Sequence, residues 1–144
     1  MGIKYLLDTN ILSELSKSKP NANVVSHINQ NGDNCSTASV VIHEINFGIN
    51  RLAEGKLKNN LRLFLKQLET YKFQIYPYDT EAACYHALER AKLVKKGLTP
   101  AFVDGQIAAI ASTNNLILVT RNTSNFINYS HLSLEDWFMP PNLI

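Results

Sequence analysis

The sequence predicts an α/β fold, a three-layer αβα sandwich with a mostly parallel central sheet. Short apolar runs of strand type alternate along the chain with longer stretches of helical periodicity. Strands that alternate with helices imply right-handed crossovers, which cover both faces of a parallel sheet with helices. In such sheets the ligand binds beyond the carboxyl ends of the strands. Polar residues that directly follow a strand are therefore candidates for a functional site.

The first half of the chain should contain two strands and three helices. Residues 4–7 are an apolar strand, and residues 8–10 open a helix that continues through Leu15 and stops at Pro20. A second short helix around residues 24–28 should end at residues 31–34, which tolerate left-handed geometry. Residues 35–37 form a strand. Residues 39–53 then form a helix with apolar side chains along one side.

The second half repeats this alternation. Leucines at helical spacing predict a helix over residues 57–68, whose opposite face carries Lys58, Arg62 and Lys66. A strand over 73–76 precedes a helix over 80–96, which Gly97 closes. Thr99 and Pro100 have the form of an N-cap and a first helical residue, so the next helix should run to about residue 113. The strand over 116–119, the loop over 120–125 and a short element over 132–137 complete the chain.

Composition indicates an ordinary globular protein. The 144 residues fit one domain, residues 1–144, and the formal charge of +2 does not by itself indicate a nucleic-acid binder. Cys35 and Cys84 lack the spacing of a zinc site, so we expect two packed, reduced thiols. No segment has the length and apolar character of a signal peptide or a membrane span. We therefore expect a cytoplasmic protein.

Three acidic residues stand at positions where a solvated acid is unexpected. Asp8 ends the apolar first strand. Glu44 and Asp104 have no charged residue three or four positions away on their predicted helices. A charged carboxylate on such a face must be paired, protonated or bound to a cation, because desolvating it alone costs several kcal/mol. Glu54, among polar neighbours, is an ordinary solvated acid by the same criterion.

These acids suit a hard cation. Mg²⁺ and Mn²⁺ prefer oxygen ligands and often combine one or two carboxylates with waters and substrate phosphates. A cation held in this way lowers the pKa of a water molecule and stabilises charge on a phosphate oxygen. We therefore predict a shared metal site formed by Asp8, Glu44 and Asp104.

Simpler interpretations exist for each acid. Asp8 would serve as a helix cap, Glu44 would lie on the surface if the helix phase is shifted, and Asp104 would pair with a buried arginine. Glu14, Glu81 and Glu89 have polar helical neighbours and should lie on solvated faces. His43 points about 100° away from Glu44 on a helix, so it is a poor candidate for a general base.

With these residues in view, the chain resembles the PIN-domain ribonucleases, specifically the VapC toxins of bacterial toxin–antitoxin pairs. The resemblance covers nearly the whole length and rests on four segments in order. These segments are residues 6–15, residues 42–45 with 47–49, residues 103–111, and residues 118–123 with 125–126.

The resemblance implies an Mg²⁺-dependent or Mn²⁺-dependent endoribonuclease with Asp8, Glu44 and Asp104 as metal ligands. Many PIN domains carry a fourth acid after the last long strand, where this chain has Asn122 and Asn125. Similar VapC proteins place asparagine at the first of these positions, so Asn122 is a fourth candidate. Three carboxylates favour a single tightly held ion.

The resemblance also implies partners. It predicts a homodimer, a cognate VapB-type antitoxin and structured RNA as substrate, with transfer RNA as a common target. Four further residues near the predicted site are candidate substrate contacts: Thr9, Asn10, Thr120 and Arg121.

Two other functions compete with this interpretation. A PIN-like protein that binds RNA without cutting it would keep the fold and lose the chemistry. A receiver-type signalling domain also places an aspartate beside Mg²⁺ at strand ends. Such domains use an adjacent pair of acids, whereas the first strand here ends with Asp8 alone.

Overall fold

A computed structural model describes residues 2–143, which form a five-stranded parallel sheet with helices on both faces. The strand order is β3-β2-β1-β4-β5, and every neighbouring pair is parallel. The strands are short: β1 (Tyr5–Leu7), β2 (Cys35–Ala38), β3 (Ile75–Tyr76), β4 (Ile117–Val119) and β5 (Ser133–Glu135). The predicted fold class is confirmed.

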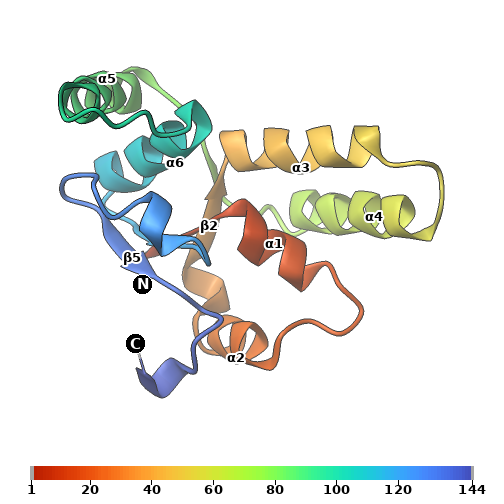
Figure 1. Ribbon diagram of the computed structural model, residues 1–144. Helices are drawn as coiled ribbons and strands as arrows, with labels where there is room; N and C mark the ends of the chain where they lie inside the picture. The colour runs from red at the N-terminus through yellow and green to blue at the C-terminus, as the bar shows by residue number, and fades with distance from the viewer. Residues whose placement is uncertain (1, 144) are drawn as a thin grey trace.

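Six α-helices connect these strands (Figure 1). They are α1 (Thr9–Leu15), α2 (Ala22–Asn31), α3 (Ser39–Arg51), α4 (Lys56–Thr70), α5 (Thr80–Lys95) and α6 (Phe102–Thr113). Short 3₁₀ turns occur at η1 (Gly32–Asn34), η2 (Thr123–Asn125) and η3 (Pro141–Leu143). Helices α3 and α4 form a long hairpin that extends away from the sheet. No helix within residues 2–143 is both long and apolar enough to cross a membrane.

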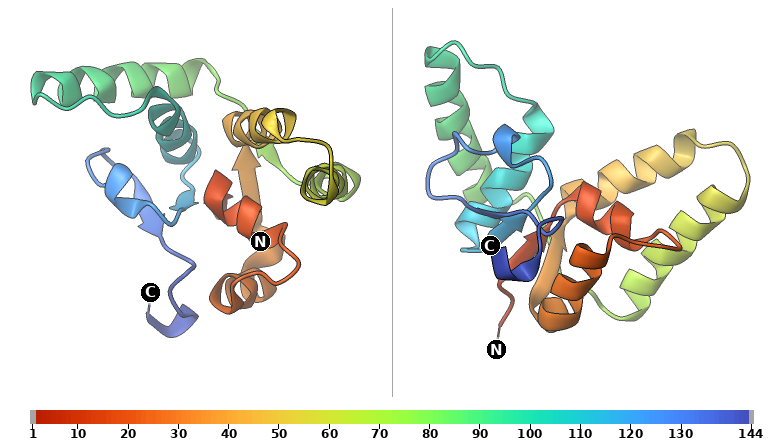
Figure 2. Two further views of the ribbon diagram at one scale, coloured as in Figure 1. Left: turned by 45° about the vertical axis from the view of Figure 1, so that its right-hand side comes forward. Right: turned by 60° about the horizontal axis from the view of Figure 1, so that its bottom comes forward.

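The strand order creates a switch point between β1 and β4. From β1 the chain moves outward through β2 to β3, then returns to β4 on the other side of β1 and continues to β5. Because crossovers are right-handed, α1 to α4 cover one face and α5 and α6 cover the other. Figure 2 shows these two groups of helices on opposite sides of the strands. The crevice at the carboxyl ends of β1 and β4 is where open α/β sheets place ligands.

Apolar strands and helix faces pack into one core around the sheet. The residues of β1 are buried, and so are the polar residues of β2. Ser36 Oγ donates to the Tyr5 carbonyl and Thr37 Oγ1 to the Leu7 carbonyl, both at 2.8 Å. These bonds matter because a buried hydroxyl without a partner costs about 1–3 kcal/mol. Near the C-terminus, buried Trp137 closes the core by packing against Tyr5.

Helices α5 and α6 touch at an unusually close contact. Gly105 of α6 lies against His86 of α5, and a Cβ atom at Gly105 would stand 2.2 Å from Nε2 of that histidine. His86 is 3% exposed, and its Nδ1 lies 2.8 Å from the Tyr78 hydroxyl. The ring therefore has little freedom to move aside. Glycine at this position lets α6 approach α5 one residue after Asp104.

Two local predictions differ from the structure. The segment 99–101 does not open α6: Ala101 is extended, with ψ 136°, and the helix begins at Phe102. Asp104 therefore lies in the first turn of α6, whereas a helix beginning at Pro100 would place it in the second. At the end of α2, Gly32 has φ −52° and continues into the turn η1 without left-handed geometry. Gly97 does adopt positive φ, at 79°, after α5.

Several side chains predicted to be solvated are buried instead. Glu14 is 8% exposed, and its buried carboxylate accepts hydrogen bonds from Lys17 Nζ and the Asn21 backbone N–H. The bond from Lys17 lowers the pKa of Glu14. Glu89 is 3% exposed and accepts from Ser130 N. Lys58 is also buried, so the predicted basic stripe on α4 is not a continuous solvated surface.

The remaining surface predictions are mixed. Glu54 is exposed, as expected, and pairs with Lys58 and Arg62. Cys35 is a free, buried thiol, and burial raises its pKa to about 12. Cys84 is a free but exposed thiol, so the prediction of two packed thiols is wrong for this residue.

Candidate active site

The three anomalous acids line one open pocket at the switch point of the sheet. Asp8 comes from the end of β1, Glu44 from the middle of α3 and Asp104 from the first turn of α6. The cavity measures about 340 Å³. It is lined by Asp8, Thr9, Asn10, Glu44, Val103, Asp104, Ile107 and Asn122. Residues distant in sequence therefore meet at the edge where the topology predicts a ligand.

Asp8 is the most constrained of the three acids. It is 6% exposed, and its backbone N–H donates to the Val119 carbonyl on β4 at 2.9 Å. Its carboxylate caps α1: Oδ1 accepts from Thr9 N at 2.7 Å and Oδ2 accepts from Thr120 Oγ1 at 2.8 Å. Burial and the nearby charge of Glu44 nevertheless raise the pKa of Asp8 above its ordinary value, although these hydrogen bonds oppose the rise. Asp8 is both a helix cap and part of the acidic pocket.

Thr120 connects Asp8 to the loop after β4. Its hydroxyl is fully buried, donates to Asp8, and accepts from Asn10 Nδ2 at 3.3 Å and from Asn122 N at 3.1 Å. Asn10 Oδ1 in turn accepts from Arg121 N at 3.1 Å. These bonds join the start of α1 to the end of β4 through five residues: Asp8, Asn10, Thr120, Arg121 and Asn122. Thr120 does not line the pocket but holds the Asp8 carboxylate that does.

Within the described residues, the side chains of Glu44 and Asp104 are not held by hydrogen bonds as Asp8 is. Both are half-buried, and neither makes a side-chain hydrogen bond or an ion pair within residues 2–143. Burial, together with the charges of Asp8 and Glu44, raises the pKa of Asp104. The predicted alternative for Asp104, a salt bridge to a buried arginine, is absent from the described part of the chain. The acids therefore repel one another without a compensating positive side chain.

The donor set fits a divalent cation, although the side chains do not form a finished cage. Within residues 2–143, no three acidic, histidine or cysteine groups stand close enough together to hold an ion. The pocket nevertheless offers carboxylate oxygens from three elements and the amide of Asn122, which are the ligand types that Mg²⁺ and Mn²⁺ prefer. A cation would also remove the mutual repulsion. Binding would require the carboxylates to move toward one another.

The other predicted site residues divide into two groups. Thr9, Asn10 and Asn122 line the pocket, whereas Thr120 and Arg121 do not. The Arg121 guanidinium lies 4.3 Å from the centre of the Phe138 ring, on an exposed side chain. It is therefore held by an aromatic contact outside the pocket.

Sequence reasoning missed the apolar part of the pocket. Val103 and Ile107 line it beside Asp104. A signal was available, because these residues lie one position before and three positions after Asp104 on the same helix. It also missed the bond from Thr120 to Asp8, which joins residues 112 positions apart.

Comparisons with known proteins agree with this architecture. A model of the PIN domain family matches residues 5–132. Toxin FitB of Neisseria gonorrhoeae is 33% identical over 135 residues, which cover 92% of this chain and 97% of that protein. The tRNA(fMet)-specific endonuclease VapC of Shigella flexneri is 32% identical over 135 residues, with 94% and 98% covered. Similarity therefore extends over nearly the full length of both relatives.

Solved structures show the same fold. The FitAcB complex from Neisseria gonorrhoeae matches with a TM-score of 0.80 and 30% identity, covering 96% of this chain and 99% of that chain. The DNA-bound VapBC complex from Salmonella typhimurium matches with a TM-score of 0.78 and 27% identity, covering 94% and 98%. The first structure contains FitB, which is named as a toxin, and the second is a VapBC bound to DNA. None of these findings supports a receiver-type signalling domain.

Proposed function

The chain belongs to the PIN domain family and is a ribonuclease toxin of the VapC type, and on this premise we propose that Asp8, Glu44 and Asp104 together hold a divalent cation that promotes RNA cleavage. One observation carries the proposal. Three carboxylates from separate elements line a single pocket, and no positive side chain within the described residues pairs with them. Such an arrangement stabilises a cation and disfavours the empty protein.

The residues of the pocket have separate tasks. When bound, Mg²⁺ or Mn²⁺ lowers the pKa of a water molecule and neutralises charge on the attacked phosphate. Asp8 supplies a pre-oriented carboxylate, because Thr9 N and Thr120 Oγ1 each hold one of its oxygens. Glu44 and Asp104 close on the cation from α3 and α6.

Uncharged residues complete the site. Asn122 offers an amide oxygen or positions a water molecule, and Thr9 and Asn10 lie where a phosphate oxygen would approach. With three carboxylates and no acid among residues 120–125, the site holds one ion more securely than two.

The substrate is RNA and the partner is an antitoxin of the VapB type. Two relatives are named as tRNA(fMet)-specific endonucleases, and we propose transfer RNA as the target of this chain. We also propose that the chain acts as a homodimer that binds this antitoxin; the VapBC structure that shares its fold supports the antitoxin as partner. Because transfer RNA is a cytoplasmic substrate, we place the toxin in the cytoplasm.

Cleavage of transfer RNA tests this proposal. The purified protein is incubated with tRNA in Mg²⁺, in Mn²⁺ and in EDTA, alongside Glu44→Gln and Asp104→Asn. We expect cleavage by the wild type in either cation and loss of cleavage in EDTA. Each variant should lose more than the roughly 10–100-fold that removal of an outer hydrogen bond costs at metal sites.

A matched control comes from an acid elsewhere in the chain. Asp33 is exposed and lies in the turn η1, outside the pocket, so Asp33→Asn should cut normally. Full activity of Asp104→Asn, or cleavage that persists in EDTA, would refute the metal assignment. Binding of tRNA without any cleavage by the wild type would favour the alternative of an inactive RNA-binding protein.

A further inference from the structure

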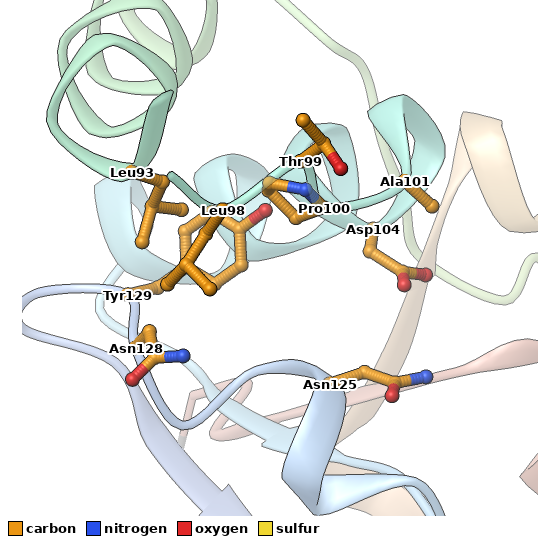
Figure 3. A pocket seen from close by; sticks show the side chains of 9 residues that line it. All are labelled: Leu93, Leu98, Thr99, Pro100, Ala101, Asp104, Asn125, Asn128 and Tyr129. Carbon is orange, nitrogen blue, oxygen red and sulfur yellow. The ribbon is translucent and has the colours of Figure 1, made fainter. Parts of the chain in front are cut away.

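A second cavity adjoins the acidic pocket and shares Asp104 with it (Figure 3). It measures about 400 Å³, within the range of roughly 300–1,000 Å³ that small-molecule pockets span. One wall comes from the extended segment before α6, including Leu98 and Pro100. The opposite wall comes from Asn125 and Asn128 in the loop that follows β4. Asp104 lies at the edge where the two cavities meet.

Tyr129 gives this cavity a hydroxyl group that makes no hydrogen bond within the described residues. The residue is 6% exposed, and its ring lies behind Leu98 in Figure 3. Within residues 2–143 its hydroxyl makes no hydrogen bond, yet no side-chain polar atom there is both fully buried and unpaired. The hydroxyl must therefore reach the open space of the cavity. Burial and the charge of Asp104 raise the pKa of Tyr129, so the group remains a neutral O–H donor.

The other lining groups combine apolar surfaces with amides. Leu98 and Pro100 present hydrocarbon, and the Tyr129 ring adds an aromatic surface. The side chains of Asn125 and Asn128 make no hydrogen bond to the described protein, so their donors and acceptors are free. An amide can donate and accept at the same time. Apolar and aromatic walls with such amides match the edge and face of a nucleobase.

We propose that this cavity receives an unstacked base of the RNA, next to the phosphate held at the acids. The inference rests on the proposed function, because it assumes that the RNA phosphate binds at the acidic pocket. The base attached to it would then enter the neighbouring cavity, which shares Asp104 with that pocket. Sequence-specific proteins read RNA chiefly at loops and ends, where bases can leave the stack and contact aromatic and amide groups. The substrate class is therefore RNA with an unpaired nucleotide at the cleavage position. A continuous duplex cannot place a base in the cavity.

Binding of RNA with and without bases tests the cavity. Fluorescence anisotropy measures the affinity of the four homo-oligonucleotides and of an abasic oligonucleotide of equal length. A homo-oligonucleotide offers the same base in every register, so the unknown cleavage position does not matter. The affinities are measured in Mg²⁺, with gel electrophoresis to check that the oligonucleotides stay intact, and again in EDTA, which prevents metal-dependent cleavage. We expect the wild type to bind at least one homo-oligonucleotide on the order of tenfold more tightly than the abasic chain.

Two substitutions should reduce this ratio. Tyr129→Phe removes the hydroxyl and keeps the buried ring, and Asn128→Ala removes one exposed amide. Each should bring the affinity for the preferred base closer to that for the abasic chain. Asn59→Ala on the exposed face of α4 should leave the ratio unchanged. Circular dichroism checks that each variant is folded.

The outcomes separate this inference from the proposed function. A wild type that binds the abasic chain as tightly as every homo-oligonucleotide would overturn the base cavity, and so would a ratio that neither substitution changes. Failure of the proposed function appears elsewhere, as absent or EDTA-resistant cleavage of tRNA. Base-dependent binding that requires Tyr129 and Asn128 would support the cavity even if cleavage failed.

Discussion

The two sides of the acidic pocket are built differently. On the strand side, Asp8 is buried and both of its carboxylate oxygens are held by hydrogen bonds. On the helix side, Glu44 and Asp104 are half-buried and have no such bonds within residues 2–143. Hydrogen bonds therefore fix the orientation of the Asp8 carboxylate. No group within the described residues fixes the carboxylates of Glu44 and Asp104 in this way.

This difference explains why the pocket is acidic without being a finished metal cage. The fold orients one carboxylate, because Asp8 also caps the start of α1. In the proposed function, Glu44 and Asp104 are free to close on a cation. Their repulsion lowers the stability of the metal-free protein, and the proposed cation would relieve it.

Among changes that leave the three acids in place, the largest effect should come from removing the hydrogen bond that orients Asp8. Thr120→Val removes the hydroxyl that donates to Asp8 Oδ2 while keeping a branched side chain of similar shape. We expect cleavage of tRNA to fall by roughly 10–100-fold, as with other groups that orient metal ligands. Thr120→Ser restores the hydroxyl and should recover most of the activity. Equal activity of Thr120→Val and the wild type would show that Asp8 needs no orientation.

The close contact between α5 and α6 next to Asp104 can be disrupted without changing any of the three acids. Gly105→Ala places a methyl group against His86, so α6 or the ring must shift. We expect a loss of roughly 1–3 kcal/mol in the free energy of unfolding, measured with urea. Gly48→Ala on α3 is the matched control, because nothing lies within 4 Å of its Cβ position. That change should stabilise the protein by about 0.5–1 kcal/mol. A neutral Gly105→Ala would mean that His86 moves freely.

A smaller effect, on thermal stability, should follow from removing the charge of Asp104. Asp104→Asn eliminates repulsion with Asp8 and Glu44, so the melting temperature of the metal-free protein at pH 7 should rise by on the order of a few degrees. Asp8→Asn should gain less, because it disturbs the bond with Thr120. A clear drop in the melting temperature of Asp104→Asn would indicate a structural role for this acid.

The pH dependence of that gain checks its cause. The pKa of Asp104 is raised in the folded protein above its ordinary value of 3.8. Below 3.8 the group is protonated in both states, and stability is lost as the pH rises through the folded pKa. The advantage of Asp104→Asn should therefore be present at pH 7 and disappear in acid. Thermal melts of both proteins across this range measure it, and a gain that is constant with pH would exclude charge repulsion.

The sequence was enough to single out the unpaired acids, because the residues that would neighbour them on a helix can be read from the sequence. Positions three and four away on a helix suffice to show that Glu44 and Asp104 lack charged partners. The same criterion failed for Glu14 and Glu89. Each has a lysine partner three positions away, Lys17 or Lys92, as helical spacing indicates. Each is buried because it also accepts from a backbone N–H outside its helix, at Asn21 or Ser130, which helical spacing does not show.

The fold class was predictable for a similar reason, since alternation of strands and helices appears in local periodicity. The start of α6 was not. Thr99 and Pro100 have the composition of a helix start, but the segment stays extended and forms a wall of the second cavity. The role of Thr120 also depends on tertiary structure, because β1 and β4 become neighbours only in the folded sheet.

Calorimetric titration with Mn²⁺ tests the central claim most directly. The account predicts that the wild type binds one ion, that Glu44→Gln and Asp104→Asn each weaken binding by about tenfold or more, and that Asp33→Asn binds as the wild type does. Equal affinity of the wild type and both pocket variants for Mn²⁺ would contradict a cation held jointly by Asp8, Glu44 and Asp104.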